Sequence, residues 1–479
     1  MDDDKQQKWQ ETIDSMSDQI HWRFALLGGK RHIYRPENGY FTEITEKECR
    51  IEVRDILKYA RSGTITEIVL NLLESSDRLL DPRLFAETRK RGIGFENGFF
   101  DLRTGQLRTY QPHDYVLDPL PHVLPKEMDS GAERWFIDEI LTSWVGKETA
   151  DWFCNLLAYQ LFIFPNVEQK WVNFFGMGAN GKSVCLKILE QALGDPKVIG
   201  CDLAHINRFS KETFDGKWLI IGRDSGSLVS DNATSLIKNY SGDDKVVVEV
   251  KGGSSYDNQV SGKLIISTNN LIQSRDRSHG WYRRLLPIPF PNEFEENPDF
   301  EQSVLKRLPQ IIRVLCHRAY LYRKNKTKLG ACLPATCRDL VQETRFVNDR
   351  VAGFWEIYFH EYVDVIQKDE QGRDVVTGTE RRLVSDRVRS LHALKMSEVY
   401  DRFCTWHKDE YGEMDIEPSL KQFGGPYGAF LQSPAGKFFE YRKTKMGRMV
   451  ELRPSLRDTF LKMPELEQDD FFDEEKNPF

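Results

Sequence analysis

The residues best suited to chemistry in this sequence form the run GMGANGKS at positions 176–183. The run fits the phosphate-loop pattern G-x-x-x-x-G-K-[ST], whose glycines let the backbone approach phosphate groups closely. Lys182 would then reach the β- and γ-phosphates of a nucleotide, and the hydroxyl of Ser183 would hold Mg²⁺. The pattern predicts a site for a nucleotide with Mg²⁺, and the alternative is a plain glycine turn.

The segments on either side of this loop give it the setting that the chemistry needs. Residues 171–175 form an apolar run that predicts a buried strand, and residues 184–193 predict a helix that ends at Gly194. In a strand–loop–helix unit, backbone N–H groups and the helix N-terminus surround the phosphate oxygens. The residues expected to contact the nucleotide are Gly176, Gly178, Ala179, Asn180, Gly181, Lys182, Ser183 and Val184.

Two polar residues follow further predicted strands. Asp224 is the first acid after the strand pattern at residues 218–222, and such an acid could organise Mg²⁺ and an attacking water. Its alternative role is that of a solvated loop aspartate. Asn269 follows the strand pattern at residues 263–268, where its amide could bond both the γ-phosphate and the lytic water. Alternatively, Asn269 and Asn270 simply form a turn.

A pair of arginines lies still further along, in the run WYRRLLPIPF at residues 281–290. Arginine is suited to neutralising charge on a transferring phosphoryl group, and a neighbouring subunit can supply it. A surface arginine pair is common, so Arg283 and Arg284 gain meaning only from their order after the three preceding elements.

Taken in this order, the motifs resemble those of superfamily 3 helicases, specifically the helicase part of phage and plasmid primases and of the poxvirus primase-helicase. The resemblance covers residues 95–290, and less specifically the chain to residue 460. The helper region that precedes the helicase in that family resembles the segment FENGFFDLRTGQL. The motifs of the helicase itself resemble, in chain order, QKWVNFFGMGANGKS, GKWLIIGRDSG, SGDDKVVVEVKGG, GKLIISTNN and WYRRLLPIPF. The sequence departs from the pattern at Asp224, where glutamate is usual, and at Ile272, where proline is usual.

The resemblance implies catalytic roles for Lys182, Asp224, Asn269 and an arginine finger at Arg284, with Arg283 as the alternative finger. Asp224 would share Mg²⁺ with Ser183. It also implies an ATPase that acts as a ring, expected to be a hexamer as in the family, on single-stranded or forked DNA in the 3′→5′ direction. The region before residue 95 is short for a primase domain, so we expect no fused primase here and a separate priming protein.

The resemblance also indicates where DNA would bind. In this family a hairpin between the second and third motifs grips one strand in the ring's channel, which makes Lys251 the best candidate for a phosphate contact. Near the carboxyl end, helices followed by a basic hairpin resemble a winged-helix module, with Arg442, Lys443, Lys445 and Arg448 near phosphates. Ordinary solvated turns are the alternative for both hairpins.

The fold expected is α/β: an AAA+-like P-loop NTPase core with a helical N-terminal helper region and a C-terminal winged-helix-like domain. Six divisions are predicted. They are a mixed and helical region (residues 1–92), the helper region (93–167), the ATPase core (168–300), a helical connector (301–345), the winged-helix-like domain (346–460) and an acidic disordered tail (461–479). The tail mixes acids with aromatics, so it either solubilises the protein or docks a replication partner.

Composition excludes several other classes. No apolar run reaches the ~18 residues of a membrane span, and the polar start MDDDKQQKWQ is unlike a signal peptide. The eight cysteines include no C-x-x-C pair, so buried free thiols are favoured over a zinc site at Cys316, His317, Cys332 and Cys337. We therefore expect a protein of the host cytoplasm that makes no membrane contact.

These observations predict an ATP-dependent replicative DNA helicase of a phage, plasmid or related mobile element. Two alternatives stay open: an initiator that uses ATP to assemble on DNA without unwinding it, and an RNA-directed helicase of a virus. A strand-displacement assay would distinguish the initiator from the helicase. Comparing the stimulation of the ATPase by DNA and by RNA would distinguish the RNA helicase from the DNA helicase.

Overall fold

The structure is a computed structural model, and it describes residues 3–27, 30–81, 83–111, 113–206, 210–223, 226–242, 245–248, 256–259, 262–276, 278–326, 328–368, 374–411, 420–424, 429–444 and 447–461. The chain divides into two compact units, Met1–Val341 and Gln342–Phe479. The predicted acidic tail lies almost wholly outside the described residues.

The first unit begins with a small α+β region. Helix α1 (Asp3–Gln19) precedes three antiparallel strands, and α2 (Glu46–Ile56), α3 (Ser62–Glu74) and α4 (Arg83–Arg91) follow them. A capping box between Thr45 and Glu48 starts α2, which buries Cys49 and Val53. A mixed and helical region was expected here, but its strands β1 (Arg23–Leu27), β2 (Lys30–Pro36) and β3 (Tyr40–Ile44) were not individually predicted.

The helper region forms a second small sheet followed by helices. Its three short antiparallel strands are β4 (Gly92–Phe95), β5 (Gly98–Asp101) and β6 (Gln106–Arg108). The two-residue strand β7 (Val116–Leu117) then pairs in parallel with β3 and joins the two regions. Beyond it come α5 (Ser130–Arg134), a π-helical segment η2 (Trp135–Leu141), α6 (Thr142–Val145) and α7 (Lys147–Phe162), as the helical spacing of aromatic residues predicts.

A five-stranded parallel sheet forms the centre of the first unit. Its strand order is β16-β8-β14-β10-β9, so the strand that leads into the glycine loop is flanked by two strands from later in the chain. The bounds are β8 (Trp171–Phe175), β9 (Val198–Cys201), β10 (Leu219–Gly222), β14 (Lys263–Thr268) and β16 (Leu285–Pro289).

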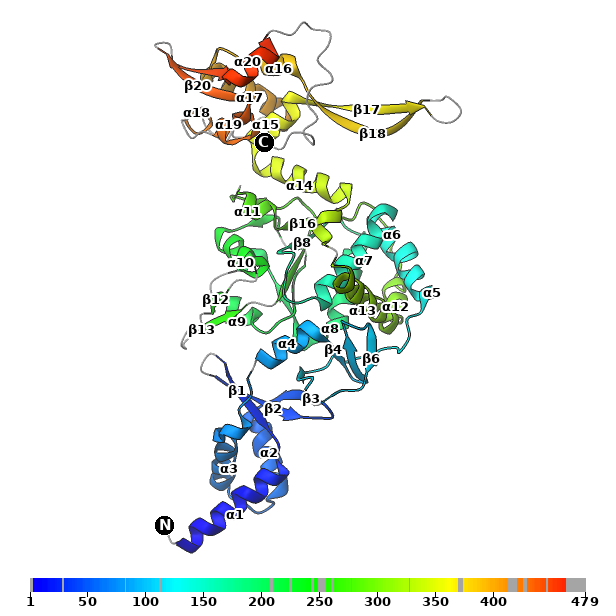
Figure 1. Ribbon diagram of the computed structural model, residues 1–479, viewed down its shortest axis with the longest axis vertical. Coiled ribbons are helices and arrows are strands. Elements are labelled where there is room, and N and C mark those ends of the chain that lie inside the picture. The colour runs from blue at the N-terminus through cyan, green and yellow to red at the C-terminus, as the bar shows by residue number, and fades with distance from the viewer. Residues whose placement is uncertain are drawn as a thin grey trace. The chain divides into compact units, whose positions relative to one another are not determined.

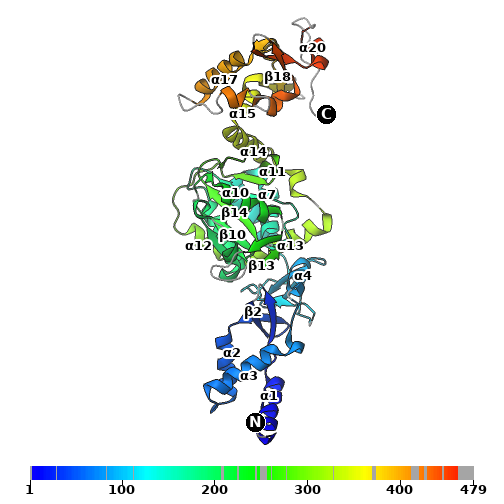
Figure 2. The same cartoon turned by 90° about the vertical axis from the view of Figure 1, so that its left-hand side faces the viewer.

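Helices cover both faces of this sheet (Figures 1 and 2). Leu219 and Ile221 of β10 pack in the core with α7, α8 (Lys182–Leu193) and α13 (Leu308–Asn325), whereas Ile220 packs on the other side with α10 (Asp231–Gly242). The strands β8, β10, β14 and β16 are therefore buried on both faces, whereas the edge strand β9 is only partly buried. Burial on both faces is usual in a parallel sheet and explains the continuous apolar runs in the sequence.

Shorter elements complete the first unit. β11 (Leu228–Val229) pairs with β15 (Gln273–Ser274), and β12 (Lys245–Val248) pairs antiparallel with β13 (Tyr256–Gln259). The remaining helices are α9 (Ser210–Phe214), α11 (His279–Tyr282), α12 (Phe300–Leu305) and α14 (Ala335–Asn348), the last of which crosses into the second unit. The predicted helical connector over residues 301–345 corresponds to α12, α13 and most of α14.

The second unit has its own aromatic core. A three-stranded sheet of order β19-β21-β20 is built from β19 (Leu394–Lys395), β20 (Phe439–Thr444) and β21 (Gly447–Leu452). Phe354, Phe403 and Phe423 pack beside it, from α15 (Arg350–Phe359), α17 (Met396–Tyr411) and α18 (Leu420–Phe423). The other helices are α16 (Ser385–Arg389), α19 (Ala429–Gln432) and α20 (Pro454–Leu461).

A long hairpin in this unit was not predicted. β17 (His360–Lys368) pairs antiparallel with β18 (Asp374–Leu383), with an irregularity between Val365 and Ile366, and Figure 1 shows the pair extending beyond the unit's helices. The fold as a whole is mixed α/β, as expected. Among the helices of the described residues, none is both long enough and apolar enough to cross a bilayer.

Candidate functional site at the carboxyl edge of the parallel sheet

The glycine loop joins β8 to α8 through backbone conformations that L side chains rarely adopt. Gly178 has φ +123° and Gly181 has φ +89°, and Gly181 is also the residue that caps α8. Gly176 lacks this constraint, but a Cβ there would lie 2.6 Å from the carbonyl oxygen of Phe290. The two glycines that define the motif are therefore required by the backbone at 181 and by close contact at 176.

Lys182 points into the loop and is only 4% exposed. Its Nζ donates to the carbonyl oxygen of Gly176 at 2.5 Å and to Oδ1 of Asn180 at 3.0 Å. Asn180 is itself fixed, because its Nδ2 donates to the carbonyl oxygen of Phe290 at 3.2 Å. Neutral oxygens thus hold the ammonium group, and anionic phosphate oxygens would be stronger acceptors for it. Ser183, the next residue, is exposed at the start of α8.

The end of β14 lies beside this loop. Thr268 pairs with Phe175, and the backbone N–H of Gly176 donates to the carbonyl oxygen of Thr268 at 3.3 Å. Asn269 follows directly and is exposed. The structure therefore brings the predicted sensor residue to the edge of the sheet where the loop lies.

A buried amide that the sequence analysis passed over fixes this arrangement. Asn173 of β8 is 1% exposed, and its Nδ2 donates to Oγ1 of Thr268 at 2.9 Å and to the carbonyl oxygen of Ile266 at 3.1 Å. These bonds tie β8 to β14 three residues before the loop begins at Gly176. The available signal was a single polar residue inside an otherwise apolar strand, because such a residue needs hydrogen-bond partners.

Asp224 lies outside the described residues. The strand before it, β10, ends at the same edge, since Gly222 pairs with Ile266 of β14. Arg223, the last described residue before Asp224, makes an ion pair with Glu190 on α8. The metal and water role of Asp224 stays a prediction.

The two arginines lie at the opposite edge of the sheet. The backbone N–H of Trp171, the first residue of β8, donates to the carbonyl oxygen of Arg284 at 2.9 Å. Arg284 is half-buried, and its Nη1 donates to the carbonyl oxygen of Gly280 at 2.8 Å. Arg283 is exposed, and its Nη1 donates to Oε1 of Gln169 at 2.8 Å. A five-residue strand of about 16 Å separates this edge from the loop, so the structure does not bring these arginines to their own chain's loop.

The predicted DNA contacts are only partly described. Lys251 and Lys445 lie outside the described residues, although the strands on either side of Lys251 pair as β12 and β13. Lys443 and Arg448 are both exposed and stand opposite each other across β20 and β21. Like charges in directly opposite positions repel, so an anion near this pair would be stabilising.

The alternative zinc site finds no support. Cys316 and Cys337 are buried, whereas Cys332 is exposed. Burial raises the pKa of the Cys337 thiol to about 12, which disfavours the thiolate that a metal needs. In the part of the chain that the structure describes, no cluster of three His, Cys, Asp or Glu side chains could hold a metal ion.

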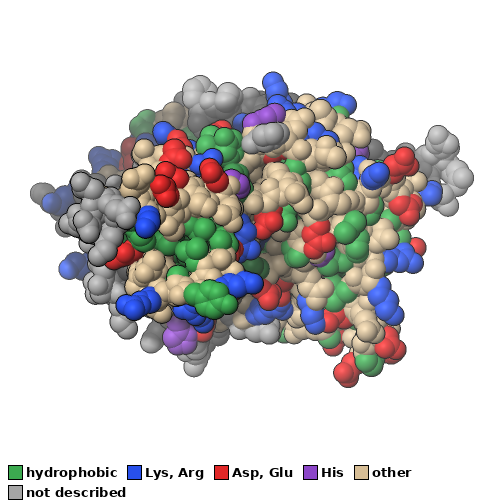
Figure 3. Space-filling view, turned by 90° about the horizontal axis from the view of Figure 1, so that it is seen from below, with side chains coloured by type: hydrophobic (Ala, Val, Ile, Leu, Met, Phe, Trp, Pro, Cys, Tyr) green, Lys and Arg blue, Asp and Glu red, His purple; other side chains and the backbone are tan. Residues whose placement is uncertain are grey.

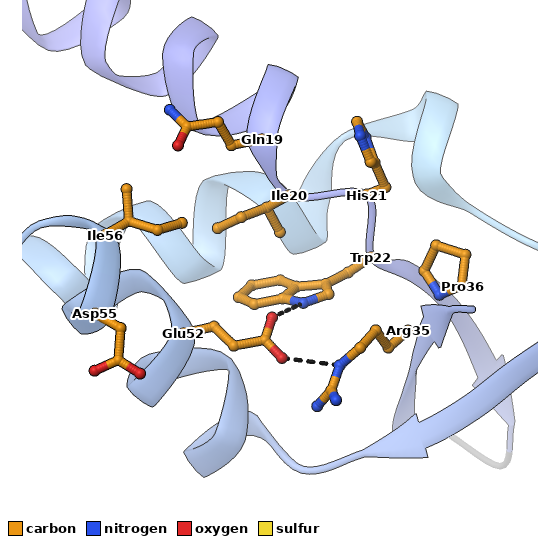
Figure 4. A pocket seen from close by; sticks show the side chains of 9 residues that line it. All are labelled: Gln19, Ile20, His21, Trp22, Arg35, Pro36, Glu52, Asp55 and Ile56. Atoms are coloured by element: carbon orange, nitrogen blue, oxygen red, sulfur yellow. Dashed lines mark hydrogen bonds and ion pairs between the residues drawn. The ribbon is translucent and has the colours of Figure 1, made fainter. Parts of the chain in front are cut away.

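A separate hollow lies in the N-terminal region (Figure 4). This cavity of about 320 Å³ is lined by residues of α1, β2, α2 and the turn after α1. Glu52 on its wall accepts a hydrogen bond from Nε1 of Trp22 at 2.6 Å and forms an ion pair with Nε of Arg35 at 2.8 Å. Figure 3 views the molecule from this end and shows acidic and basic side chains interspersed over the visible face. Both oxygens of the Glu52 carboxylate are thus paired with side chains of the cavity wall.

Two family models match the chain. One, described as D5 N terminal like, matches residues 3–142, and the other, described as a family of unknown function (DUF5906), matches residues 174–284. The second match thus contains the glycine loop, Asn269 and both arginines. The first match includes most of residues 1–92, to which the sequence motifs assign no role.

Two curated viral proteins are similar in sequence. Putative helicase L207/L206 of Acanthamoeba polyphaga mimivirus is 24% identical over 270 residues, which make up 53% of this chain and 27% of that protein. Putative helicase 184R of Invertebrate iridescent virus 6 is 23% identical over 233 residues, or 44% of this chain and 23% of that protein. The chain thus spans about a quarter of the length of these relatives.

Solved apo structures of the NrS-1 C terminal region also align with this chain. One covers 91% of this chain and 97% of that chain, with a TM-score of 0.45 and 13% identity. A second covers 92% and 97%, with a TM-score of 0.43 and 12% identity. Likeness at these scores does not establish a shared fold. The two family segments and the viral relatives confirm the predicted resemblance to phage and viral primase-helicases.

Proposed function

We propose that this chain, which has the D5-like and DUF5906 segments of the phage and viral primase-helicase group, is an ATP-dependent replicative DNA helicase that works as a ring. The observation that supports it most is the division of the predicted site between two edges of one sheet. Lys182 and Asn269 lie at the carboxyl edge, and Arg283 and Arg284 lie at the amino edge. A complete site then needs a second copy of the chain.

The residues present at the loop fit a nucleotide. Gly176 and Gly181 leave room for close backbone approach. The carbonyl oxygen of Gly176 and Oδ1 of Asn180, which accept from Lys182, are neutral and therefore weaker acceptors than phosphate oxygens. In this proposal Ser183 and Asp224 hold Mg²⁺, and Asn269 orients the lytic water beside the γ-phosphate. ATP supplies the driving force through cleavage of its terminal phosphoanhydride bond by water, which yields ADP and phosphate.

The strand order supports an AAA+-like core for this proposal. In an open parallel sheet, ligands bind beyond the carboxyl ends of the strands where the strand order reverses. Here β8 lies between β14 and β16, so the loop after β8 stands at such a position.

DNA contact is assigned to two hairpins. Lys251, between β12 and β13, would grip one strand in the ring's channel, and hydrolysis would move that hairpin in the 3′→5′ direction. Lys443, Lys445 and Arg448 would bind phosphates from a winged-helix-like second unit. The order β19-β21-β20, with helices between β19 and β20, supports that assignment. Contacts of this kind are salt-dependent and tolerant of sequence.

A forked DNA duplex with one labelled strand tests the proposal. The wild-type protein with ATP and Mg²⁺ should release the labelled strand, and Lys182→Ala should not. ATPase activity and DNA binding without strand release would instead favour an ATP-switched initiator. Stimulation of the ATPase by RNA and not by DNA would favour a viral RNA helicase.

A further inference from the structure

A tryptophan from outside the DUF5906 segment supports the glycine loop from behind. Trp144 of α6 is fully buried, and a Cβ at Gly181 would overlap its indole ring. The nearest ring atom to that position is Nε1, the only hydrogen-bond donor of the side chain. Trp144 therefore fixes the space behind the last turn of the loop, immediately before Lys182.

A second segment crosses the same loop from the other direction. After β16, the backbone N–H of Phe290 donates to the carbonyl oxygen of Phe175 at 2.8 Å, and that of Phe294 donates to the carbonyl oxygen of Ala179 at 2.8 Å. Between them, Nδ2 of Asn292 donates to the carbonyl oxygen of Ser143 at 2.7 Å. Because Ser143 precedes Trp144, the two supports are joined to each other.

The indole nitrogen of Trp144 has a further property. Among the described residues it has no hydrogen-bond partner, although it is enclosed by protein. A buried donor without an acceptor is unfavourable, and in native proteins such a group calls for an explanation. The tryptophan at the far end of β8, Trp171, is also buried with an unpartnered Nε1, but it lies at the other edge of the sheet.

Nucleotide binding would change the bonds around this donor. Lys182 must leave Gly176 and Asn180 in order to reach phosphate, and the loop oxygens then lose their donor. The loop has to readjust between its two supports. Trp144 limits that movement through its ring and has an N–H free for an oxygen that the readjusted loop presents.

We propose that Trp144 is a positioning residue for the bound nucleotide, and that the Ser143–Asn292 bond holds it against the loop. The ligand class is a nucleoside di- or triphosphate with Mg²⁺, so this inference rests on the proposed function. It extends the nucleotide site beyond residues 174–284 and into the helper region. Occupancy of the loop is thereby linked to the helices that precede the sheet.

Calorimetric titration with MgADP tests this inference in the full chain. Trp144→Phe removes the indole N–H and keeps an aromatic ring, and Asn292→Ala removes the exposed anchor. Each should raise the Kd for MgADP by about 3- to 10-fold, as expected for one lost hydrogen bond. Trp171→Phe and Asn297→Ala are the matched controls and should keep the wild-type Kd. MgADP should also change the tryptophan fluorescence of the wild type and of Trp171→Phe, but not that of Trp144→Phe.

The inference is overturned if Asn292→Ala binds MgADP as the wild type does and Trp144→Phe loses no more affinity than Trp171→Phe. Should Trp144→Phe fail to fold, Asn292→Ala decides alone, since its side chain is exposed. Failure of the proposed function looks different. In that case the wild type itself binds no MgADP, or Lys182→Ala binds it equally well, and both proposals fall together.

Discussion

The backbone N–H of Trp171 donates to the carbonyl oxygen of Arg284 at 2.9 Å, at the end of β8 that is farthest from the glycine loop. This bond fixes the arginine pair at the amino edge of the sheet. Arg283 is exposed and its Nη1 donates to Oε1 of Gln169, whereas Arg284 is half-buried and its Nη1 donates to the carbonyl oxygen of Gly280. The sequence resemblance favours Arg284 as the arginine finger and gives Arg283 as the alternative, and this choice stays a prediction.

Replacing Lys182 by alanine should lower the kcat of ATP hydrolysis by about 100-fold or more, because the main cation at the phosphates is lost. The fold should persist, since Gly176 and Asn180, which accept from Nζ of Lys182, both belong to the loop. A steady-state phosphate-release assay measures the effect. Lys187→Ala is the matched control, as Lys187 lies on the same helix but pairs with Glu301. Wild-type turnover in Lys182→Ala would contradict the assigned site.

Asn269→Ala should lower kcat by about 100-fold while the Kd for MgADP changes little, because the amide acts on the γ-phosphate and the lytic water. The neighbouring Asn270→Ala serves as the control, since Asn270 is equally exposed at the same turn. Turnover and nucleotide affinity are measured in parallel. Equal losses in the two variants would mean that the turn itself matters and that Asn269 is no sensor.

Lys443→Ala should weaken DNA binding to a similar degree for all sequences and should lower the salt dependence of log K by about one unit. Fluorescence anisotropy with a labelled forked DNA at several salt concentrations measures both quantities. Lys437→Ala is the control, because Lys437 is an exposed lysine that precedes the hairpin. An unchanged salt slope in Lys443→Ala would remove this hairpin from the DNA-binding surface.

Lys197 should make stability depend on pH. Burial lowers the pKa of its ammonium group to about 8 from 10.5, although Asp118 favours the charged form. Between these values the unfolded chain binds more protons than the folded chain, so the contribution of Lys197 to the free energy of unfolding increases as the pH rises. Below pH 8 both states are protonated and the contribution is constant.

Urea titrations of the wild type and of Lys197→Met measure this effect. The free energy of unfolding of the wild type minus that of the variant should increase by about 2 kcal/mol between pH 8 and pH 10. Lys217→Met, which removes a less buried lysine bonded to the carbonyl oxygen of Pro196, should show no such pH-dependent gap. If the difference in free energy of unfolding between the wild type and Lys197→Met does not change with pH, the lowered pKa of Lys197 is contradicted.

The sequence was sufficient to predict the parts of the fold that have strong periodicity. The apolar runs at β8, β10 and β14 are buried on both faces, so they stand out as continuous hydrophobic segments. The strands β1 to β3 and the hairpin of β17 and β18 contain many polar and charged residues, and their pairing depends on contacts between strands. For that reason the sequence pattern did not reveal them.

The site was predictable in its parts but not in its arrangement. The types and order of Lys182, Asn269 and Arg284 could be read directly. Their distribution over two edges arises because the arginines precede β16 whereas the loop and Asn269 follow β8 and β14, and the three strands run parallel. No local pattern specifies that parallel pairing. Trp144 could not be selected from the sequence, because its spacing is that of an ordinary core aromatic and its importance comes from contact with Gly181.

A mixed-subunit ATPase measurement tests the central claim most directly. Subunits that lack the finger arginine, tested as Arg284→Ala and as Arg283→Ala, are inactive by this account, and so are subunits of Asp224→Ala. When an arginine variant and the aspartate variant are combined, some interfaces receive an intact arginine from one copy and an intact loop and acid from the other. The account predicts partial recovery of ATPase activity, with a maximum at intermediate mixing ratios. No recovery at any ratio with either arginine variant, in mixtures shown to co-assemble, would contradict a site shared between two copies.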